Sequence, residues 1–112
     1  MTIETVVQRH LNALEKGDLA LIMADYADDA VLMFPERSLK GKAAIEQFFD
    51  EVITEYGAAA LAGVKVLRQD THANIVYVSW VQNEGTEHAM KGSDTYLIEN
   101  DKIRVQAVYD AI

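Results

Sequence analysis

Apolar residues recur at helical spacing near the start of the chain and predict two helices in succession. Four of them lie at intervals of four, four and three residues: Ile3, Val7, Leu11 and Leu14. This spacing places them on one face of a helix. Gly17 is a typical residue for ending a helix, and Asp18 is a typical residue for capping the next one. We therefore expect a first helix that ends at Gly17 and a short second helix that begins after Asp18.

A longer apolar stripe marks the middle of the chain. Between Ala43 and Tyr56 the apolar positions fall at i, i+3, i+4, i+7, i+8 and i+11: Ile45, Phe48, Phe49, Val52, Ile53 and Tyr56. This pattern predicts one amphipathic helix with a continuous buried stripe, which Gly57 ends. Ahead of it, residues 31–34 form a short β-type run that Pro35 closes.

After Gly57 the apolar pattern changes to a period of two, with many β-branched and aromatic residues. It predicts four strands, at residues 62–69, 75–83, 87–99 and 102–111. Short turn-forming segments join them, so we expect an antiparallel meander. Helices followed by a sheet indicate an α+β fold. A curved sheet that wraps around the long third helix leaves a hollow between the first helix, the sheet and the last strand, where ligands usually bind.

The size and charge of the chain narrow the classes of function. With 112 residues, 50% of them hydrophobic and 25% charged, we expect residues 1–112 to form a single domain. A net charge of −8 disfavours nucleic acid and anionic membrane surfaces as partners. The basic residues between Arg37 and Lys42 are too few for a binding footprint, and we interpret them as a solvated loop. No segment approaches the about 20 apolar residues of a membrane span, so we expect a cytoplasmic protein.

Metal and thiol chemistry are also disfavoured. The chain has no cysteine, which excludes disulfides and thiolate nucleophiles. Its three histidines, His10, His72 and His88, show no paired ligand spacing. We expect neither a metal nor a cofactor.

Residues 6–49 resemble the N-terminal half of ketosteroid isomerase. The same features occur in the same order: a helix, Gly17 and Asp18, the turn Tyr-Ala-Asp-Asp-Ala at 26–30, a short strand ending in Pro35, Gly41, and a Phe-rich helix. The second half, with Lys-Gly-Ser-Asp-Thr-Tyr at 91–96, is similar to the wider superfamily that includes the SnoaL-like polyketide cyclases and nuclear transport factor two. The resemblance implies a cone-shaped, cystatin-like α+β barrel with three N-terminal helices and a curved, partly mixed sheet.

The resemblance assigns three positions to chemistry. His10 stands where the isomerase has a catalytic tyrosine, Phe34 stands where it has its carboxylate base, and Asp94 retains its buried acid. Phenylalanine cannot abstract a proton, so steroid isomerisation by that mechanism is disfavoured. In the SnoaL-like cyclases a matching aspartate is thought to act as acid or base, and Asp94 fits either chemistry.

The residues themselves support two candidates for proton transfer, Asp94 and His10. Asp94 alternates with Tyr96 and Ile98, which should point inward, and a buried carboxyl needs a partner or a raised pKa. Its alternative role is a bond to a loop or a neighbouring strand. His10 lies on the flank of the first helix's apolar stripe, where histidine can act as acid or base. Its alternative role is a half-buried histidine that bonds a carbonyl.

The last strand has two faces that compete for the interior. Patterning places Ile103, Val105, Ala107 and Tyr109 inward, whereas the family analogy places Arg104, Gln106, Val108 and Asp110 in the pocket; a solvent-facing role for Arg104 and Gln106 also stays open. Two faces with apolar character favour a homodimer through the outer sheet face. The expected ligand pocket comprises Tyr26, Phe34, Phe49, Trp80, Tyr96, Arg104, Gln106, Val108 and Asp110, of which Tyr26 and Trp80 also fit plain core roles.

These features lead to a hypothesis and two alternatives. The hypothesis is a pocket protein that carries out isomerase- or cyclase-type proton transfer on a small cyclic or carbonyl compound, with Asp94 and His10 handling protons. The main alternative is a non-catalytic ligand-binding or dimerisation module of the same fold. Epoxide hydrolysis would need Arg104 between two carboxylates, Asp94 and Asp110, and their spacing matches this poorly.

Overall fold

The first two helices begin and end at the residues that the sequence marks for this purpose. The computed structural model describes residues 1–111 and contains α1 (Ile3–Lys16) and α2 (Leu19–Ala24). Gly17 ends α1 in the left-handed conformation, with φ of 64°, and its N–H bonds the carbonyls of the last turn. The carboxylate of Asp18 then accepts the N–H of Leu21 and caps α2. Both predicted helices are confirmed.

Six strands form one sheet in the order β2-β1-β6-β5-β4-β3. Their bounds are β1 (Tyr26–Met33), β2 (Ser38–Lys40), β3 (Val64–His72), β4 (Ile75–Gln82), β5 (Met90–Glu99) and β6 (Lys102–Ala111). Strands β3 to β6 form the predicted antiparallel meander. Strand β1 joins β6 in parallel, and β2 pairs with β1 at the edge, so the sheet is mixed.

Two predictions for the segment before the long helix were wrong. Residues 26–30, expected as a turn, are the first half of β1, because the side chains of Tyr26 and Ala30 face the core and are buried. Residues 38–40, expected as part of a solvated loop, form β2. A backbone hydrogen bond of 2.7 Å from Phe34 N–H to the carbonyl of Arg37 closes the reversal around Pro35 and brings β2 alongside β1.

The long helix α3 (Lys42–Tyr56) is present as predicted, but its apolar stripe is not continuously buried. Only Ile45 and Phe49 are buried, Phe48 is half-buried, and Tyr56 is 70% exposed. The reason is the position of the helix, which packs against β1, β2 and the short 3-10 helix η1 (Ala58–Leu61) at one end of the sheet. Its last turn therefore extends beyond the core.

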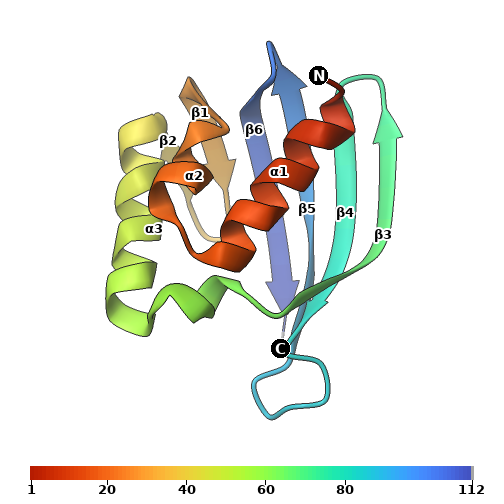
Figure 1. Cartoon of the computed structure of the whole chain (residues 1–112). Helices are drawn as coiled ribbons and strands as arrows, with labels where there is room; N and C mark the ends of the chain where they lie inside the picture. The colour runs from red at the N-terminus through yellow and green to blue at the C-terminus, as the bar shows by residue number, and fades with distance from the viewer. Residues whose placement is uncertain (112) are drawn as a thin grey trace.

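All the helices of the described residues lie on one side of the sheet (Figure 1). Helix α1 crosses β4 and β5, and α3 packs on the β1 end. The core between these layers is built from apolar side chains of both, among them Val6, Val7, Ile22, Ile45, Leu32, Val76, Val78, Tyr96 and Ile103. The hollow expected between α1, the sheet and the last strand lies on this inner side.

A β-bulge at Arg104 resolves the conflict between the two faces of the last strand. Ile98 pairs with Ile103 and Leu97 pairs with Val105, so one step along β5 matches two steps along β6. Arg104 is the extra residue, and the side-chain alternation restarts after it. Ile103 faces inward before the bulge, and Gln106 and Val108 face inward after it. Each of the two competing interpretations was therefore right for one half of the strand.

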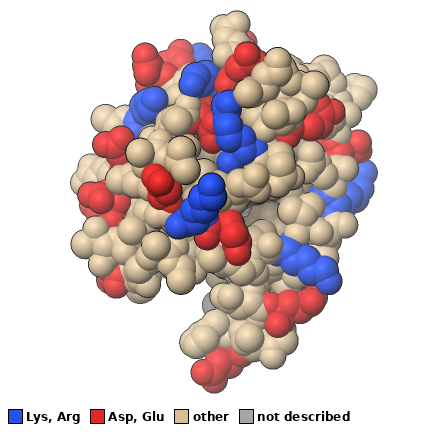
Figure 2. All heavy atoms as spheres, in the orientation of Figure 1, with Lys and Arg blue, Asp and Glu red and all other residues tan. Residues whose placement is uncertain are grey.

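The surface carries both signs of charge. Figure 2 shows acidic and basic side chains interspersed over one face of the molecule, without a continuous basic area on that face. None of the helices in residues 1–111 has the length and apolar character needed to cross a membrane.

Candidate functional site

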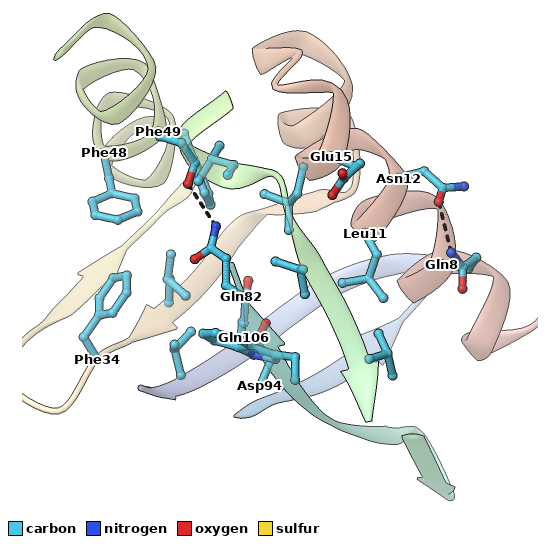
Figure 3. A pocket seen from close by; sticks show the side chains of 18 residues that line it. Gln8, Leu11, Asn12, Glu15, Phe34, Phe48, Phe49, Gln82, Asp94 and Gln106 are labelled. Carbon is cyan, nitrogen blue, oxygen red and sulfur yellow. Dashed lines mark hydrogen bonds between the residues drawn. The ribbon is translucent and has the colours of Figure 1, made fainter. Parts of the chain in front are cut away.

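A cavity of about 350 Å³ lies between α1, α3, η1 and the inner face of the sheet (Figure 3). Most of its lining is apolar and comes from every layer: Leu11, Leu14, Leu32, Phe34, Phe48, Phe49, Ala60, Leu61, Val64, Val66, Trp80 and Val108. The polar lining residues are fewer: Gln8, Asn12, Glu15, Gln82, Asp94 and Gln106. An apolar chamber with a few placed polar groups is the usual form of a small-molecule site.

Asp94 is the one acidic side chain that the sheet contributes to the lining described above. It is 8% exposed, and its Oδ2 accepts a hydrogen bond of 3.0 Å from the hydroxyl of Tyr96. Its Oδ1 is buried and has no hydrogen-bond partner among the described residues. Burial raises the pKa of Asp94 to about 6, against the opposing effect of the hydrogen bond from Tyr96 and of the nearby indole of Trp80, and nearby Asp110 adds a further raising effect. Asp94 can therefore hold or release a proton near neutral pH.

Gln106 lies on the same wall as Asp94. Asp94 pairs with Val108 and Tyr96 pairs with Gln106, so Asp94 and Gln106 occupy diagonal positions on one face of neighbouring strands. Figure 3 shows both side chains at the floor of the cavity. A carboxyl and an amide are thus available to a single polar group of a ligand.

His10 lies behind the cavity and is not part of its lining. It is fully buried, and its ring contacts side chains instead of the backbone carbonyl that the alternative role required. Its Nδ1 lies 3.4 Å from Oδ2 of Asp25, and its Nε2 lies 3.3 Å from the hydroxyl of Tyr26. His10 reaches the cavity only through other side chains.

The two buried tyrosines support the cavity wall from behind. Tyr26 and Tyr96 are both fully buried, and burial raises the pKa of each well above 10. Tyr26 donates a 2.5 Å hydrogen bond to Oε1 of Gln106, and Tyr96 bonds Asp94. Tyr26 thus contacts Gln106 of the cavity wall, and Tyr96 contacts Asp94.

Besides Tyr26 and Tyr96, two more residues expected in the pocket, Arg104 and Asp110, lie outside the cavity. Arg104 sits at the bulge and forms an ion pair of 3.2 Å with exposed Asp29. Asp110 shares the inward parity but lies near the end of β6, where its side chain is exposed. Arg104 is therefore not held between Asp94 and Asp110, which is the arrangement that epoxide hydrolysis would need.

The apolar residues expected in the pocket, Phe34, Phe49, Trp80 and Val108, line its wall. Phe34 packs on Phe48 with ring centroids 5.1 Å apart, and Phe48 packs on Phe49 at 5.2 Å. Trp80 and Val108 line the wall as well. Trp80 has its place because Gly92 lies beside it: a Cβ on Gly92 would come within 2.7 Å of the indole ring.

Several lining residues were not expected from the sequence. Those on α1, Gln8, Asn12 and Glu15, lie on its polar flank, and hydrophobic patterning assigns such positions to solvent. The sequence pattern could have identified Gln82, since it lies two residues after Trp80 and so on the same face of the strand. Its amide donates to the carbonyls of Ala60 and Ala62, at 3.1 and 2.7 Å, and so holds η1 at the cavity rim.

Within residues 1–111 no cluster of three or more His, Cys, Asp or Glu side chains could hold a metal ion. From the sheet, the cavity receives the carboxyl of Asp94, the amides of Gln106 and Gln82, and apolar side chains.

Comparisons with known proteins agree with this architecture. The sequence profile of the SnoaL-like domain matches residues 7–106. None of the curated protein sequences matches the chain. Among solved structures, an NTF-2 like protein of unknown function from Burkholderia xenovorans is 18% identical, with a TM-score of 0.80 over 97% of this chain and 82% of that one.

Two further solved structures have a similar fold. A protein of unknown function with a cystatin-like fold from Methylobium petroleophilum is 15% identical, with a TM-score of 0.76 over 98% of this chain and 76% of that one. A protein proposed to be a ketosteroid isomerase, from Kribbella flavida, is 15% identical, with a TM-score of 0.78 over 98% and 78%. At these identities the likeness extends to the fold.

Proposed function

Since the chain belongs to the SnoaL-like domain family, we propose that its cavity binds a small, carbonyl-bearing organic molecule and that Asp94 transfers a proton to or from it. One observation carries the proposal. Asp94 is a buried carboxyl at an otherwise mostly apolar cavity, one of its oxygens has no hydrogen-bond partner within residues 1–111, and its pKa is raised to about 6. Such perturbed carboxyls in concave sites are candidates for function.

The raised pKa supports a role in either direction of proton transfer. General acids and bases work best when their pKa lies near the operating pH. In the protonated form, Asp94 would donate to a carbonyl oxygen; in the ionised form, it would abstract an acidic proton next to a carbonyl. The apolar lining, including Phe34, Phe49 and Trp80, suits the hydrocarbon part of a cyclic ligand.

Phe34 limits which mechanism this proposal includes. It lies at the cavity in the place where the resemblance expected a carboxylate base, and its ring packs on Phe48. A mechanism with a separate base at that position and an acid at Asp94 is therefore not proposed. Asp94 would act as the single proton-transferring carboxyl, and His10 would act through the side chains between it and the cavity.

A simple substrate tests the proposal. We expect the protein to convert 3-cyclohexen-1-one to its conjugated isomer, a proton transfer that ultraviolet absorbance follows directly. Asp94→Asn should reduce the rate constant by about 100-fold or more, in the range of general acid-base contributions. Asp70→Asn, a matched change at an exposed carboxyl of β3, should leave it unchanged. Equal rates for the Asp94 variant and the wild type would contradict the assignment.

The second candidate function is a non-catalytic ligand-binding module, and the observation that favours it is again Phe34 at the cavity. If this alternative holds, cyclohexanone or 3-cyclohexen-1-one should raise the melting temperature of the wild type and of Asp94→Asn equally. The protein should not convert 3-cyclohexen-1-one. A ligand that binds the native state raises the melting temperature by mass action.

We also propose a homodimer through the outer face of the sheet. Register places Met33, Ile75 and Tyr109 on the side opposite Asp94 and Tyr96. Their side chains are 38%, 43% and 64% exposed, and Figure 1 shows the helices only on the other side. In the proposed dimer these exposed apolar side chains would lie in the contact between the two copies.

A further inference from the structure

A line of polar side chains connects the outer surface of α1 with the cavity wall. Arg9 Nε donates to Oδ1 of Asp25 at 2.5 Å, and Oδ2 of Asp25 lies 3.4 Å from Nδ1 of His10. On its other side, Nε2 of His10 lies 3.3 Å from the hydroxyl of Tyr26, which donates to Oε1 of Gln106. All members except Arg9 are buried, and Gln106 lines the cavity.

The protons in this line can be counted. Tyr26 has one O–H, and it donates that proton to Gln106. The contact between Tyr26 and Nε2 of His10 is then favourable only when Nε2 itself carries a proton. A proton on Nδ1 as well would face the carboxylate of Asp25, which lies 3.4 Å away. With the amide of Gln106 in this orientation, the line is complete when both ring nitrogens of His10 carry a proton.

A neutral His10 requires a different arrangement of the same groups. Asp25 keeps the remaining proton on Nδ1, so Nε2 becomes an acceptor for the hydroxyl of Tyr26. Once Tyr26 donates to His10, its oxygen needs a donor from Gln106. The amide of Gln106 supplies one by turning over, which exchanges its oxygen and nitrogen with almost no change in shape.

We infer that Gln106 is a specificity-determining residue of the cavity, and that Asp25, His10 and Tyr26 are positioning residues that decide which end of its amide faces the ligand. With His10 protonated, the NH₂ group faces the cavity and donates. With His10 neutral, the carbonyl oxygen faces the cavity and accepts. This role rests on the proposed function, because it needs a ligand in the cavity.

The two states match two kinds of ligand group. Asp94 lies diagonal to Gln106 on the same wall. When Asp94 is protonated and Gln106 presents its NH₂, both donate, which suits a carbonyl oxygen or an oxyanion. When Asp94 is ionised and Gln106 presents its oxygen, both accept, which suits a hydroxyl or an amine. The cavity would thus change its preferred ligand group with pH.

The groups on either side of His10 in this line keep a fixed protonation state. Asp25 from the end of α2, Tyr26 from β1 and Tyr96 from β5 face the ring, and Arg9 and Asp94 lie one contact further away. Burial raises the pKa of Asp25, but contacts with His10 and Arg9 outweigh it and leave that pKa below its usual value. Burial raises the pKa of Tyr26 well above 10. Asp25 therefore stays ionised, and Tyr26 keeps its proton.

Nuclear magnetic resonance of the ¹⁵N-labelled, ligand-free protein tests this inference. A pH series follows the ring nitrogens of His10 and the side-chain NH₂ of Gln106 in the same sample. We expect the Gln106 signals to shift with the same midpoint as the ring of His10. The side-chain NH₂ of Gln82 is the internal control: it lines the same cavity but donates to backbone carbonyls, so it should not follow His10.

The variant Tyr26→Phe removes the connecting hydroxyl. In this variant the Gln106 signals should no longer follow the ring nitrogens of His10. The inference is overturned if Gln106 does not follow His10 in the wild type, which decides the matter even if the variant fails to fold. It is also overturned if neutral His10 carries its proton on Nε2. Because no ligand is present, failure here leaves the enone assay of Asp94 untouched, and inactivity in that assay leaves this result untouched.

Discussion

The hydroxyl of Tyr96 donates a 3.0 Å hydrogen bond to Oδ2 of Asp94, two residues earlier on the same face of β5. This bond stabilises the ionised carboxylate and so opposes the effect of burial on its pKa. The acidity of Asp94 is therefore set by a balance that a single side chain can change.

Tyr96→Phe should raise the pKa of Asp94 further, because burial persists and the hydrogen bond to the ionised form is lost. We expect an upward shift of about one unit, measured on the ¹³C carboxyl resonance of Asp94. Tyr77→Phe, on the opposite face of the sheet, is the control and should not shift it. A pKa that stays at its wild-type value in Tyr96→Phe would show that the bond does not contribute.

Asp94→Asn should stabilise the protein at neutral pH. The pKa of Asp94 is about 6 in the folded state against a usual 3.8, so the native state binds the proton more tightly than the unfolded chain. The stabilisation that this tighter proton binding gives to the native state is complete below about pH 4 and is lost as pH rises through about 6. Asparagine does not titrate and has no such loss. Between about pH 4 and about pH 7, the unfolding free energy of the variant should therefore increase relative to that of the wild type by on the order of 3 kcal/mol.

Urea unfolding of both proteins at about pH 4 and about pH 7 measures this difference. Comparing the variant with the wild type cancels the opposite contribution of Asp25, whose lowered pKa stabilises above its usual value and is lost as pH falls. A difference between the two proteins that is the same at both conditions would contradict the raised pKa.

Gly92→Ala should disturb the cavity wall. A Cβ at this position would lie 2.4 Å from the carbonyl oxygen of Tyr109 and 2.7 Å from the ring of Trp80, so backbone or ring must move. We expect a loss of about 1 to 3 kcal/mol in unfolding free energy and a change in the fluorescence of Trp80, the only tryptophan. Lys91→Ala, at the exposed neighbouring position, should change neither. Wild-type stability in Gly92→Ala would rule out the tight contact.

Tyr109→Glu should dissociate the proposed dimer, because it places a charge on the outer face of the sheet, where Tyr109 is 64% exposed. Sedimentation velocity over a concentration series measures the association. Tyr56→Glu, at an equally exposed aromatic residue on α3, is the control and should leave it intact. A monomeric wild type at all concentrations would contradict the dimer.

Local pattern was sufficient to predict most of the fold. The intervals of α1, Gly17 with Asp18, and the period-two strands from β3 to β6 are all confirmed. The inward orientation of Asp94 with Tyr96 and Ile98 is confirmed too, since all three are buried. These features depend on neighbours in sequence, which is why a single chain reveals them.

The features that the sequence did not reveal depend on contacts between residues that are distant in sequence. Residues 26–30 contain acidic residues typical of a turn, and they become strand because Tyr26 pairs with Ile103 of β6 and the side chains of Tyr26 and Ala30 are buried in the core. Asp25 gave no signal as a partner of His10, because their contact requires α1 and the end of α2 to pack together. The polar flank of α1 faces the cavity only because η1 folds back over it.

The single extra residue in β6 makes that strand behave as two short pieces with opposite orientation. The first piece anchors the core through Ile103, and the second presents Gln106 and Val108 to the chamber. Without the bulge, the same sequence would alternate regularly from Ile103 and would turn Val105, Ala107 and Tyr109 toward the chamber in place of Gln106 and Val108. Deleting Arg104 would remove the bulge but leave Gln106 and Val108 facing the chamber. The bulge thus gives the chamber its polar floor, which a regular strand of the same sequence would replace with an apolar one.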